Sequence, residues 1–233
     1  QLLNAALARR LTGPGELDLI HRQQAALESM ANLLNALLDI TKLESGNIRP
    51  NLEVVPVADV LADLQQQFEA VATSRNLALT IAPTSLCLRT DRILFRQVLQ
   101  NLLNNALQYT REGGVTVSFG EDATGFSIRI ADTGVGIPAP ELDRVFDEYY
   151  RLDATGPRPR GFGLGLTIVR QISRLLGYTV KVESELGRGT TFALHVPARH
   201  LVATPVAADV QPGPRRARPG RERLVTKTGR MFQ

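Results

Sequence analysis

Apolar residues recur at three- and four-residue intervals between Glu16 and about Ser45, and this spacing predicts a long amphipathic helix. Residues 1–11 have the pattern of an earlier helix end, and the breakers TGPG at residues 12–15 separate the two helices. The broad apolar stripe of the long helix consists of Leu17, Ile20, Leu27, Met30, Ala31, Leu34, Leu37, Leu38 and Thr41. Because one hairpin cannot bury a stripe this wide, we expect a second copy to complete a dimeric four-helix bundle. Packing onto the rest of the same chain is the alternative.

Beyond the hairpin, predicted helices are interspersed with strands. The pattern predicts helices over residues 57–75, 92–109 and 163–176, and strands over residues 77–82, 115–120, 126–132, 179–185 and 190–196. Paired strands, rather than strict alternation of single strands and helices, indicate an α+β fold with helices on one face of a mixed sheet. We therefore predict a truncated hairpin in residues 1–50, a two-layer α/β sandwich in residues 51–198 and a tail in residues 199–233.

The net charge of +4 belongs to the tail. Residues 199–233 contain 8 Lys or Arg and 2 Asp or Glu, which leaves 19 basic and 21 acidic residues in residues 1–198. The part expected to fold is therefore slightly acidic, and we expect no nucleic-acid partner. The Pro, Gly and Arg content of the tail is typical of a linker, with phosphate binding as the alternative.

The cysteine content and the length of the apolar runs restrict the cellular compartment. Cys87 is the only cysteine, which excludes an intrachain disulfide and a cysteine-based zinc site and favours a reducing compartment. No apolar run approaches the ~18–20 residues that cross a bilayer. We expect a cytoplasmic chain, with any membrane anchor supplied upstream of Gln1.

Three glycine-rich stretches lie in the second unit. Asp132 ends a predicted strand and is followed by Gly134 and Gly136, so a carboxylate lies where the backbone can approach a ligand closely. This combination suits the exocyclic amine of adenine. The stretch GFGLGL at residues 161–166 opens a predicted helix, whose free N–H groups favour phosphate. The third stretch, GRGT at residues 187–190, joins two strands; for each stretch, a tight turn without a ligand is the alternative.

The helix predicted over residues 92–109 carries two asparagines on one face. Asn101 and Asn105 are four residues apart, whereas Asn104 points elsewhere. Asparagine is a poor helix former, and amide oxygens are suitable ligands for Mg²⁺, which also binds water and nucleotide phosphates. The pair is therefore a candidate for metal binding, with hydrogen bonding to neighbouring loops as the alternative.

Five segments in chain order resemble the signatures of bacterial sensor histidine kinases. They are NLLNNALQYT (101–110), DTGVGIP (132–138), VFDEYYR (145–151), GFGLGL (161–166) and GRGTTF (187–192), which resemble the N box, first glycine box, F box, second glycine box and final glycine box. The segment LLDITKLESG at residues 37–46 is similar to the second helix of the family's dimerisation and phosphotransfer domain. The resemblance implies an ATP-dependent protein histidine kinase of a two-component system, built on the ATPase fold shared with topoisomerases and chaperones.

The resemblance also implies roles for individual residues. Asn105 would hold Mg²⁺, Asp132 would accept a hydrogen bond from the adenine amine with support from Thr190, and Tyr109 would line the adenine site. Residues 147–160 would form a mobile ATP lid in which Arg151 reaches phosphate. The implied nucleotide-binding set is Asn101, Asn105, Gln108, Tyr109, Asp132, Gly134, Gly136, Arg151, Gly161, Gly163, Leu164, Gly165, Leu166 and Thr190.

The resemblance also implies partners, and the sequence differs from the family's pattern at two points. The family implies a homodimer through the hairpin, the receiver domain of a response regulator as partner, and anchoring of the full-length protein in the bacterial inner membrane. Gln108 stands where the family often has Lys or Arg. The family's acceptor motif, a histidine followed by an acidic residue and Pro-Leu, is absent, so we expect the acceptor upstream of Gln1. We interpret His21, His195 and His200 as structural, and predict that this chain alone does not phosphorylate itself.

Two other functions remain open at this point. The chain could be a nucleotide-binding signalling module that has lost its kinase activity. It could also be the ATPase of a chaperone, topoisomerase or mismatch-repair protein. Those proteins commonly carry a catalytic glutamate on the asparagine helix, whereas residues 97–100 are QVLQ and Asn104 precedes Asn105.

Overall fold

The computed structural model describes residues 48–151 and 163–202 without a break. In the hairpin it describes Gln23, Leu27, Met30, Ala31, Leu33, Leu34, Leu37, Leu38, Ile40, Thr41 and Leu43, all of them helical. The predicted first helix, Leu17 and Ile20 of the stripe, His21, most of the predicted lid and the tail after residue 202 lie outside the described residues.

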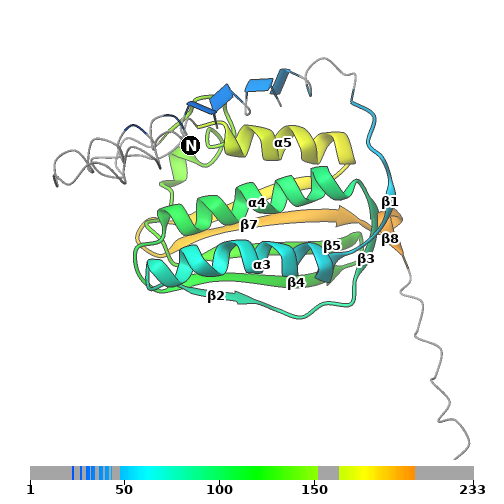
Figure 1. Cartoon of the computed structure of the whole chain (residues 1–233), viewed down its shortest axis with the longest axis horizontal. Helices are drawn as coiled ribbons and strands as arrows, with labels where there is room; N and C mark the ends of the chain where they lie inside the picture. The colour runs from blue at the N-terminus through cyan, green and yellow to red at the C-terminus, as the bar shows by residue number, and fades with distance from the viewer. Residues whose placement is uncertain are drawn as a thin grey trace, which may run out of the picture.

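A five-stranded mixed sheet forms one layer of the domain (Figure 1). Its strands are β2 (Ala78–Ile81), β4 (Gly114–Asp122), β5 (Gly125–Asp132), β6 (Thr179–Glu185) and β7 (Gly189–Pro197), in the order β2-β4-β5-β7-β6. The pair β2 and β4 is parallel, and every other pair in this sheet is antiparallel. All five strands lie within two residues of their predicted bounds, which confirms the mixed sheet.

Three helices form the second layer and cover one face of this sheet (Figure 1). They are α3 (Val57–Ser74), α4 (Arg92–Tyr109) and α5 (Gly165–Leu176). Asp91 begins α4, because its Oδ1 accepts hydrogen bonds from the N–H groups of Ile93 and Leu94 at 3.0 Å each. Gly177, with φ of 72°, ends α5 in the left-handed conformation. Short 3-10 turns lie between β5 and α5, at Ala139–Glu141, and directly after β7, at Ala198–His200. The predicted α+β class is confirmed.

A second, three-stranded sheet was not predicted. It pairs β1 (Glu53–Pro56) and β8 (Leu201–Val202) antiparallel with β3 (Cys87–Thr90), in the order β1-β3-β8. None of the strands predicted from the sequence corresponds to these three. Asp91 also links the entering chain to this sheet, because its Oδ2 accepts from the N–H of Asn51 at 2.8 Å.

Helix α4 lies at the centre of the hydrophobic core. Its side chains Phe95, Val98, Leu99, Leu102 and Leu103 are at most 1% exposed and pack in one cluster with the inward-facing residues of the sheet and of α3 and α5. Burial on both sides keeps α4 fixed against the sheet, which is what a helix carrying ligand-binding side chains requires.

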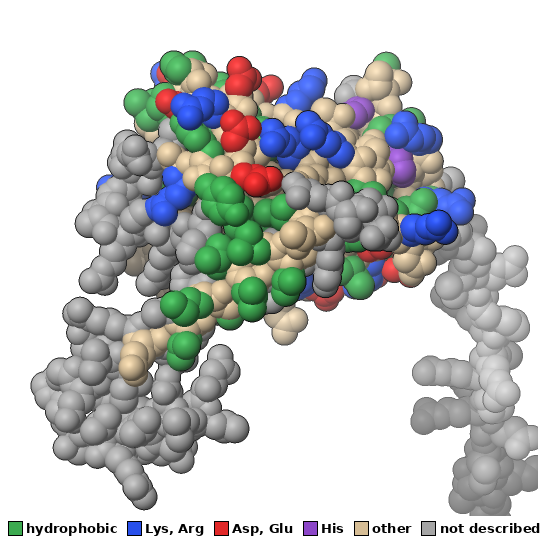
Figure 2. Space-filling view, turned by 90° about the horizontal axis from the view of Figure 1, so that it is seen from above, with side chains coloured by type: hydrophobic (Ala, Val, Ile, Leu, Met, Phe, Trp, Pro, Cys, Tyr) green, Lys and Arg blue, Asp and Glu red, His purple; other side chains and the backbone are tan. Residues whose placement is uncertain are grey.

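The hairpin helix contacts the core mainly through residues outside the predicted stripe. Ile40 is buried in the core cluster, with Leu33, Leu37 and Leu43 packed against it. Leu27, Met30, Leu34 and Leu38 are 46–66% exposed and form a line of apolar side chains on the surface (Figure 2). Among the described residues of the predicted stripe, only Leu37 packs on its own chain, and the others remain exposed and open for a partner. Among the described residues, no helix has the length and apolarity to span a membrane.

Candidate nucleotide-binding site

A cavity of about 80 Å³ opens between α4, the end of β5, the start of β7 and α5. It is lined by Asn105, Tyr109, Asp132, Val135, Gly136, Ile137, Val145, Tyr150, Arg151, Leu166, Thr190 and Phe192. Apolar walls with a few convergent polar groups are typical of small-molecule sites. The remaining polar groups of the site are arranged around this cavity.

Helix α4 contributes Asn105 and Tyr109 from one face, four residues apart. The end of the helix is held by Arg75, whose guanidinium donates to the carbonyls of Leu107 and Thr110. The Asn101 side chain lies one turn earlier: its amide donates to the carbonyl of Gln97 at 3.0 Å, and its Oδ1 faces Gly165 at the start of α5. Asn101 is thus positioned beside the α5 N-terminus rather than in the cavity.

Asp132 ends β5 with its carboxyl group at the cavity. Its Oδ1 accepts from the N–H of Gly134 at 2.8 Å and from the N–H of Thr190 at 3.3 Å. Within the described part of the chain, Oδ2 accepts no hydrogen bond and is available to a ligand N–H. Burial raises the pKa of this carboxyl above its ordinary value of 3.8, and the two backbone hydrogen bonds lower it only in part.

The loop after β5 packs so closely that glycine is required. A side chain at Gly134 would lie 2.5 Å from the carbonyl oxygen of Tyr109, and one at Gly136 would lie 2.1 Å from that of Glu185. Gly136 also has φ of 72°, which favours glycine. The loop is tied to α4 by a hydrogen bond from the Val135 N–H to the Tyr109 carbonyl at 3.3 Å. The first glycine box therefore fixes Asp132 relative to the asparagine helix.

A cluster of aromatic and charged side chains closes another side of the cavity. The Tyr150 hydroxyl donates to Glu141, and the Arg144 guanidinium lies 4.4 Å from the centre of the Tyr150 ring. Arg144 and Glu141 form an ion pair at 3.6 Å. These contacts hold Tyr150 at the cavity wall, next to Arg151.

The cavity brings together seven of the predicted residues: Asn105, Tyr109, Asp132, Gly136, Arg151, Leu166 and Thr190. Gly134 contacts Asp132 directly, whereas Asn101, Gln108, Gly163, Leu164 and Gly165 do not line the cavity, and Gly161 lies outside the described residues. Sequence reasoning did not select Val135, Ile137, Val145, Tyr150 and Phe192 as site residues. All five fall inside the recognised boxes, Phe192 as the last residue of the final one, so membership of a box was the available signal.

The histidines that the structure describes lie outside the cavity. The Nε2 of His195 is 3.3 Å from the Thr124 hydroxyl, and the Nδ1 of His200 is 3.2 Å from the Arg89 carbonyl; neither histidine lines the cavity. No cluster of three or more His, Cys, Asp or Glu side chains that could hold a metal occurs among the described residues.

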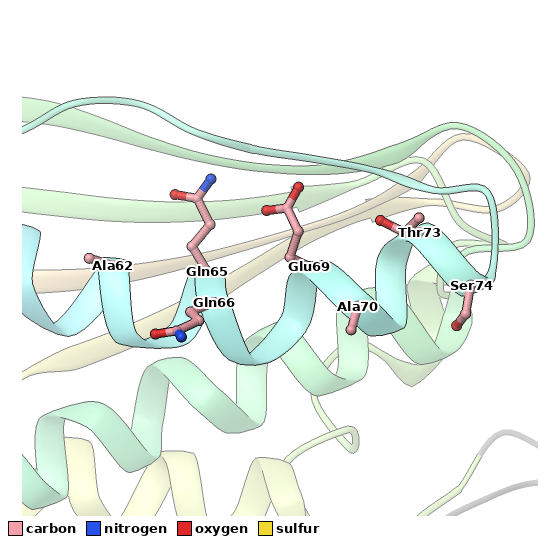
Figure 3. A pocket seen from close by; sticks show the side chains of 7 residues that line it. All are labelled: Ala62, Gln65, Gln66, Glu69, Ala70, Thr73 and Ser74. Carbon is pink, nitrogen blue, oxygen red and sulfur yellow. The ribbon is translucent and has the colours of Figure 1, made fainter.

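A second depression lies on α3 and is unrelated to the cavity (Figure 3). It is lined by Ala62, Gln65, Gln66, Glu69, Ala70, Thr73 and Ser74, all from this one helix. Glu69 is its only charged side chain. A single helix face offers no convergent groups for chemistry, so we assign it no function.

The comparisons with known proteins agree with this geometry. Residues 90–200 match the family described as histidine kinase-, DNA gyrase B- and HSP90-like ATPase. The aerobic respiration control sensor protein ArcB of Escherichia coli (strain K12) is 33% identical over 176 residues, which are 73% of this chain and 23% of that protein. The autoinducer 2 sensor kinase/phosphatase LuxQ of Vibrio cholerae is 31% identical over 188 residues, 77% of this chain and 22% of that protein.

Solved structures show the same relationship. Full-length ShkA in complex with AMPPNP has a TM-score of 0.69 and 25% identity, covering 83% of this chain and 40% of that chain. The mycobacterial sensor histidine kinase MprB has a TM-score of 0.55 and 26% identity, covering 64% of this chain and 99% of that chain.

The fold and the site thus define an ATP-binding domain of the histidine kinase, gyrase B and HSP90 class. Its relatives and structural neighbours narrow this class further: they include sensor kinases, and this chain carries the ATPase domain of histidine kinases. The resemblance inferred from the five boxes is confirmed. The chain spans about a quarter of the length of the curated relatives named above.

The raised pKa of Asp132 leads to a prediction about stability. Asp132→Asn is expected to raise the free energy of unfolding of the nucleotide-free protein at pH 7, because asparagine keeps an oxygen for the Gly134 and Thr190 N–H groups without a buried charge. The carboxyl has a higher pKa in the folded than in the unfolded state, so the wild type loses unfolding free energy as the pH rises above 3.8. The advantage of the variant should therefore shrink as the pH falls toward 4. Urea unfolding of both proteins between pH 4 and 8 tests this, and an advantage that is constant over that range would contradict it.

Proposed function

We propose that this chain binds ATP with Mg²⁺ and acts as the catalytic part of a protein histidine kinase, transferring the γ-phosphoryl group to a histidine for relay to a response-regulator aspartate. The observation that supports this most directly is the shared cavity: Asn105 from the asparagine helix, Asp132 from the first glycine box and Arg151 from the F box line one space. The relationship to sensor kinases and to a structure in complex with AMPPNP supports the same assignment.

The cavity suits an adenine base. The free oxygen of Asp132 is placed to accept from the exocyclic amine, and Thr190 lies beside it through the hydrogen bond between its N–H and the carboxylate. Apolar side chains, including Ile137, Val145 and Phe192, provide a surface for a planar ring. Gly136 allows the backbone to approach the ring closely.

Phosphates and metal are assigned to the Asn105 side of the cavity. The Asn105 amide oxygen is a hard ligand suited to Mg²⁺, whose other ligands would be phosphate oxygens and water. When bound, Mg²⁺ offsets charge on the β- and γ-phosphate oxygens. Arg151 is positioned to contact phosphate, and the backbone at Gly163, Leu164, Gly165 and Leu166 leads into the N-terminus of α5, where N–H groups favour anions. Gln108 would leave the phosphates without a cation that the family often has at this position.

The proposed reaction is an in-line transfer. A nitrogen lone pair of the acceptor imidazole attacks the γ-phosphorus, and the bond between this phosphorus and the β,γ-bridging oxygen breaks. ADP leaves with the electron pair of that bond. We do not propose His195 or His200 as the acceptor, because both lie in the ATPase domain, in contact with the Thr124 hydroxyl and the Arg89 carbonyl.

Transfer of label in trans tests the proposal. The protein is mixed with Mg²⁺, ATP labelled at the γ-phosphate, and a homologous dimerisation hairpin that carries its acceptor histidine. We expect acid-labile, alkali-stable label on the hairpin and none on the chain itself, because proximity rather than covalent connection sets the geometry. Binding of ATP without any transfer would contradict the kinase assignment and favour a nucleotide-binding signalling module. Restored transfer with Gln108→Lys would locate the defect at the missing cation.

The open part of the hairpin stripe supports a homodimer. Leu27, Met30, Leu34 and Leu38 are spaced so that they follow one side of the helix, and large apolar side chains in a row are typical of an interface. We propose that a second copy of the hairpin covers them. Residues 1–50 would then form the dimerisation unit and residues 51–198 the catalytic domain of a cytoplasmic kinase.

Leu34→Glu is expected to weaken this dimer at least 10-fold, because it places an unpaired charge in the middle of the apolar row. Sedimentation at micromolar concentration measures the change. Gln23→Glu adds the same charge at an exposed position of the same helix and is the control. A wild-type protein that is monomeric throughout the micromolar range would contradict the proposed interface.

A further inference from the structure

We infer that Ser184 is a positioning residue, which fixes the direction of the Thr190 hydroxyl proton so that the cavity accepts hydrogen bonds at this point and selects a base that carries an amino group. The inference rests on the proposed binding of a nucleotide. Ser184 lies on β6 directly opposite Thr190 on β7, and it does not itself line the cavity.

Three hydrogen bonds meet at the Ser184 hydroxyl. Its oxygen is 2.8 Å from the N–H nitrogen of Ile137, 2.7 Å from the carbonyl oxygen of Gly189 and 2.9 Å from the hydroxyl oxygen of Thr190. These partners belong to the first glycine box and to the final glycine box. Ser184 therefore joins the two loops that hold Asp132 from either side.

The chemistry of these partners assigns the protons. The Ile137 N–H can only donate, and the Gly189 carbonyl can only accept. A serine hydroxyl has one proton and two lone pairs, so the Ser184 proton goes to Gly189, and one lone pair accepts from Ile137. The second lone pair then accepts the proton of Thr190. The opposite assignment, with Ser184 donating to Thr190, would leave two oxygens 2.7 Å apart with no proton between them.

This arrangement determines what Thr190 presents to the cavity. Its proton is directed to Ser184, and its N–H is directed to the Oδ1 of Asp132, so the Thr190 hydroxyl offers only lone pairs. The free oxygen of Asp132 is an acceptor as well. Two neighbouring acceptors match the amino group of adenine, which has two N–H bonds, and oppose the carbonyl oxygen that hypoxanthine or guanine carries at the same position.

Inosine triphosphate tests the inference, because it replaces the adenine amino group by a carbonyl and keeps the same ribose and phosphates. We expect the wild-type protein to bind ATP at least about 10-fold more tightly than inosine triphosphate, both with Mg²⁺, since unpaired buried acceptors are unfavourable. In Ser184→Ala the Thr190 hydroxyl can turn and donate to the carbonyl, and the affinity ratio should fall about 5-fold. Ser184→Thr should restore the ratio. Ser118→Ala, on the opposite face of the sheet from the helices, is the matched control.

A merely structural role for Ser184 gives a different result. If Ser184 only connects the two loops, Ser184→Ala weakens ATP and inosine triphosphate equally and leaves their ratio unchanged, which overturns the inference. Thr190→Val provides a second test. It should lower the ratio of ATP affinity to inosine triphosphate affinity as Ser184→Ala does. In the double variant, Ser184→Ala should not lower this ratio further. If Ser184→Ala does not fold, Ser184→Cys keeps the volume with a much weaker hydrogen-bonding group and should lower the ratio. Absence of ATP binding by the folded wild type would instead contradict the proposed function.

Discussion

Asp132→Asn is expected to weaken ATP binding by about 100-fold while the protein stays folded. In the variant, the amide oxygen keeps the place of Oδ1, because it must accept from the Gly134 and Thr190 N–H groups. The amide nitrogen then takes the place of the free oxygen and presents N–H bonds to the adenine amine, which also donates. Hydrogen bonds to charged groups contribute about 1.5–3 kcal/mol, and about 1.4 kcal/mol corresponds to a factor of ten in affinity.

Calorimetric titration with ATP and Mg²⁺ at neutral pH measures this loss. Asp59→Asn is the control, since it makes the same chemical change at an exposed position on α3. Equal affinities for wild type and Asp132→Asn would show that the Asp132 carboxylate does not contact the base. The combination expected here, lower affinity with higher stability of the free protein, separates loss of a ligand contact from loss of fold.

Gly189→Ala is expected to lower the free energy of unfolding by about 3 kcal/mol or more and to abolish ATP binding. Gly189 has φ of 111°, and a side chain there would lie 1.9 Å from the carbonyl oxygen of Asp132. Strands β5 and β7 would have to separate where Asp132 pairs with Thr190, which is the polar edge of the cavity.

Gly187, two residues earlier in the same turn, provides the matched comparison. Its φ of 80° disfavours a side chain, but apart from Gly187 and its two chain neighbours no atom lies within 4 Å of the position that the side chain would take. Gly187→Ala is therefore expected to cost only about 1–2 kcal/mol, the backbone preference alone. Urea unfolding of both variants measures the difference, and equal losses would show that the close approach at Asp132 can relax.

Local signals explain which parts of the fold could be predicted. Helix α4 was predicted with both ends, because its periodicity is regular and Asp91 caps it through nearby backbone N–H groups. Strand β3 was not predicted as a strand. Its four residues are buried at three positions and show no alternation, and its partners β1 and β8 come from distant parts of the chain. Pairing of this kind is specified by tertiary packing rather than by local pattern.

The candidate site also has residues that could be predicted from the sequence and residues that could not. Asp132 and Asn105 could be selected because each lies in a short recognisable motif, and both line the cavity. Ser184 could not, because its contribution depends on the register of β6 against β7, which places it opposite Thr190. No residue type or spacing near Ser184 indicates that its hydroxyl meets two glycine boxes. Contacts across a sheet become visible only when the strand pairing is known.

The small sheet β1-β3-β8 connects the ATPase domain to the chain segments on either side of it. The chain arrives from the hairpin through β1 and leaves through β8, and both strands are bonded to opposite edges of β3. A pull on β1 or β8 along the strand direction therefore acts on the hydrogen bonds that join that strand to β3. Asp91 comes directly after β3. One of its carboxylate oxygens accepts a hydrogen bond from the Asn51 N–H, before β1, and the other accepts from the first turn of α4. A displacement of the hairpin would therefore reach the first turn of α4, the helix that carries Asn105 about 21 Å further along its axis at 1.5 Å per residue.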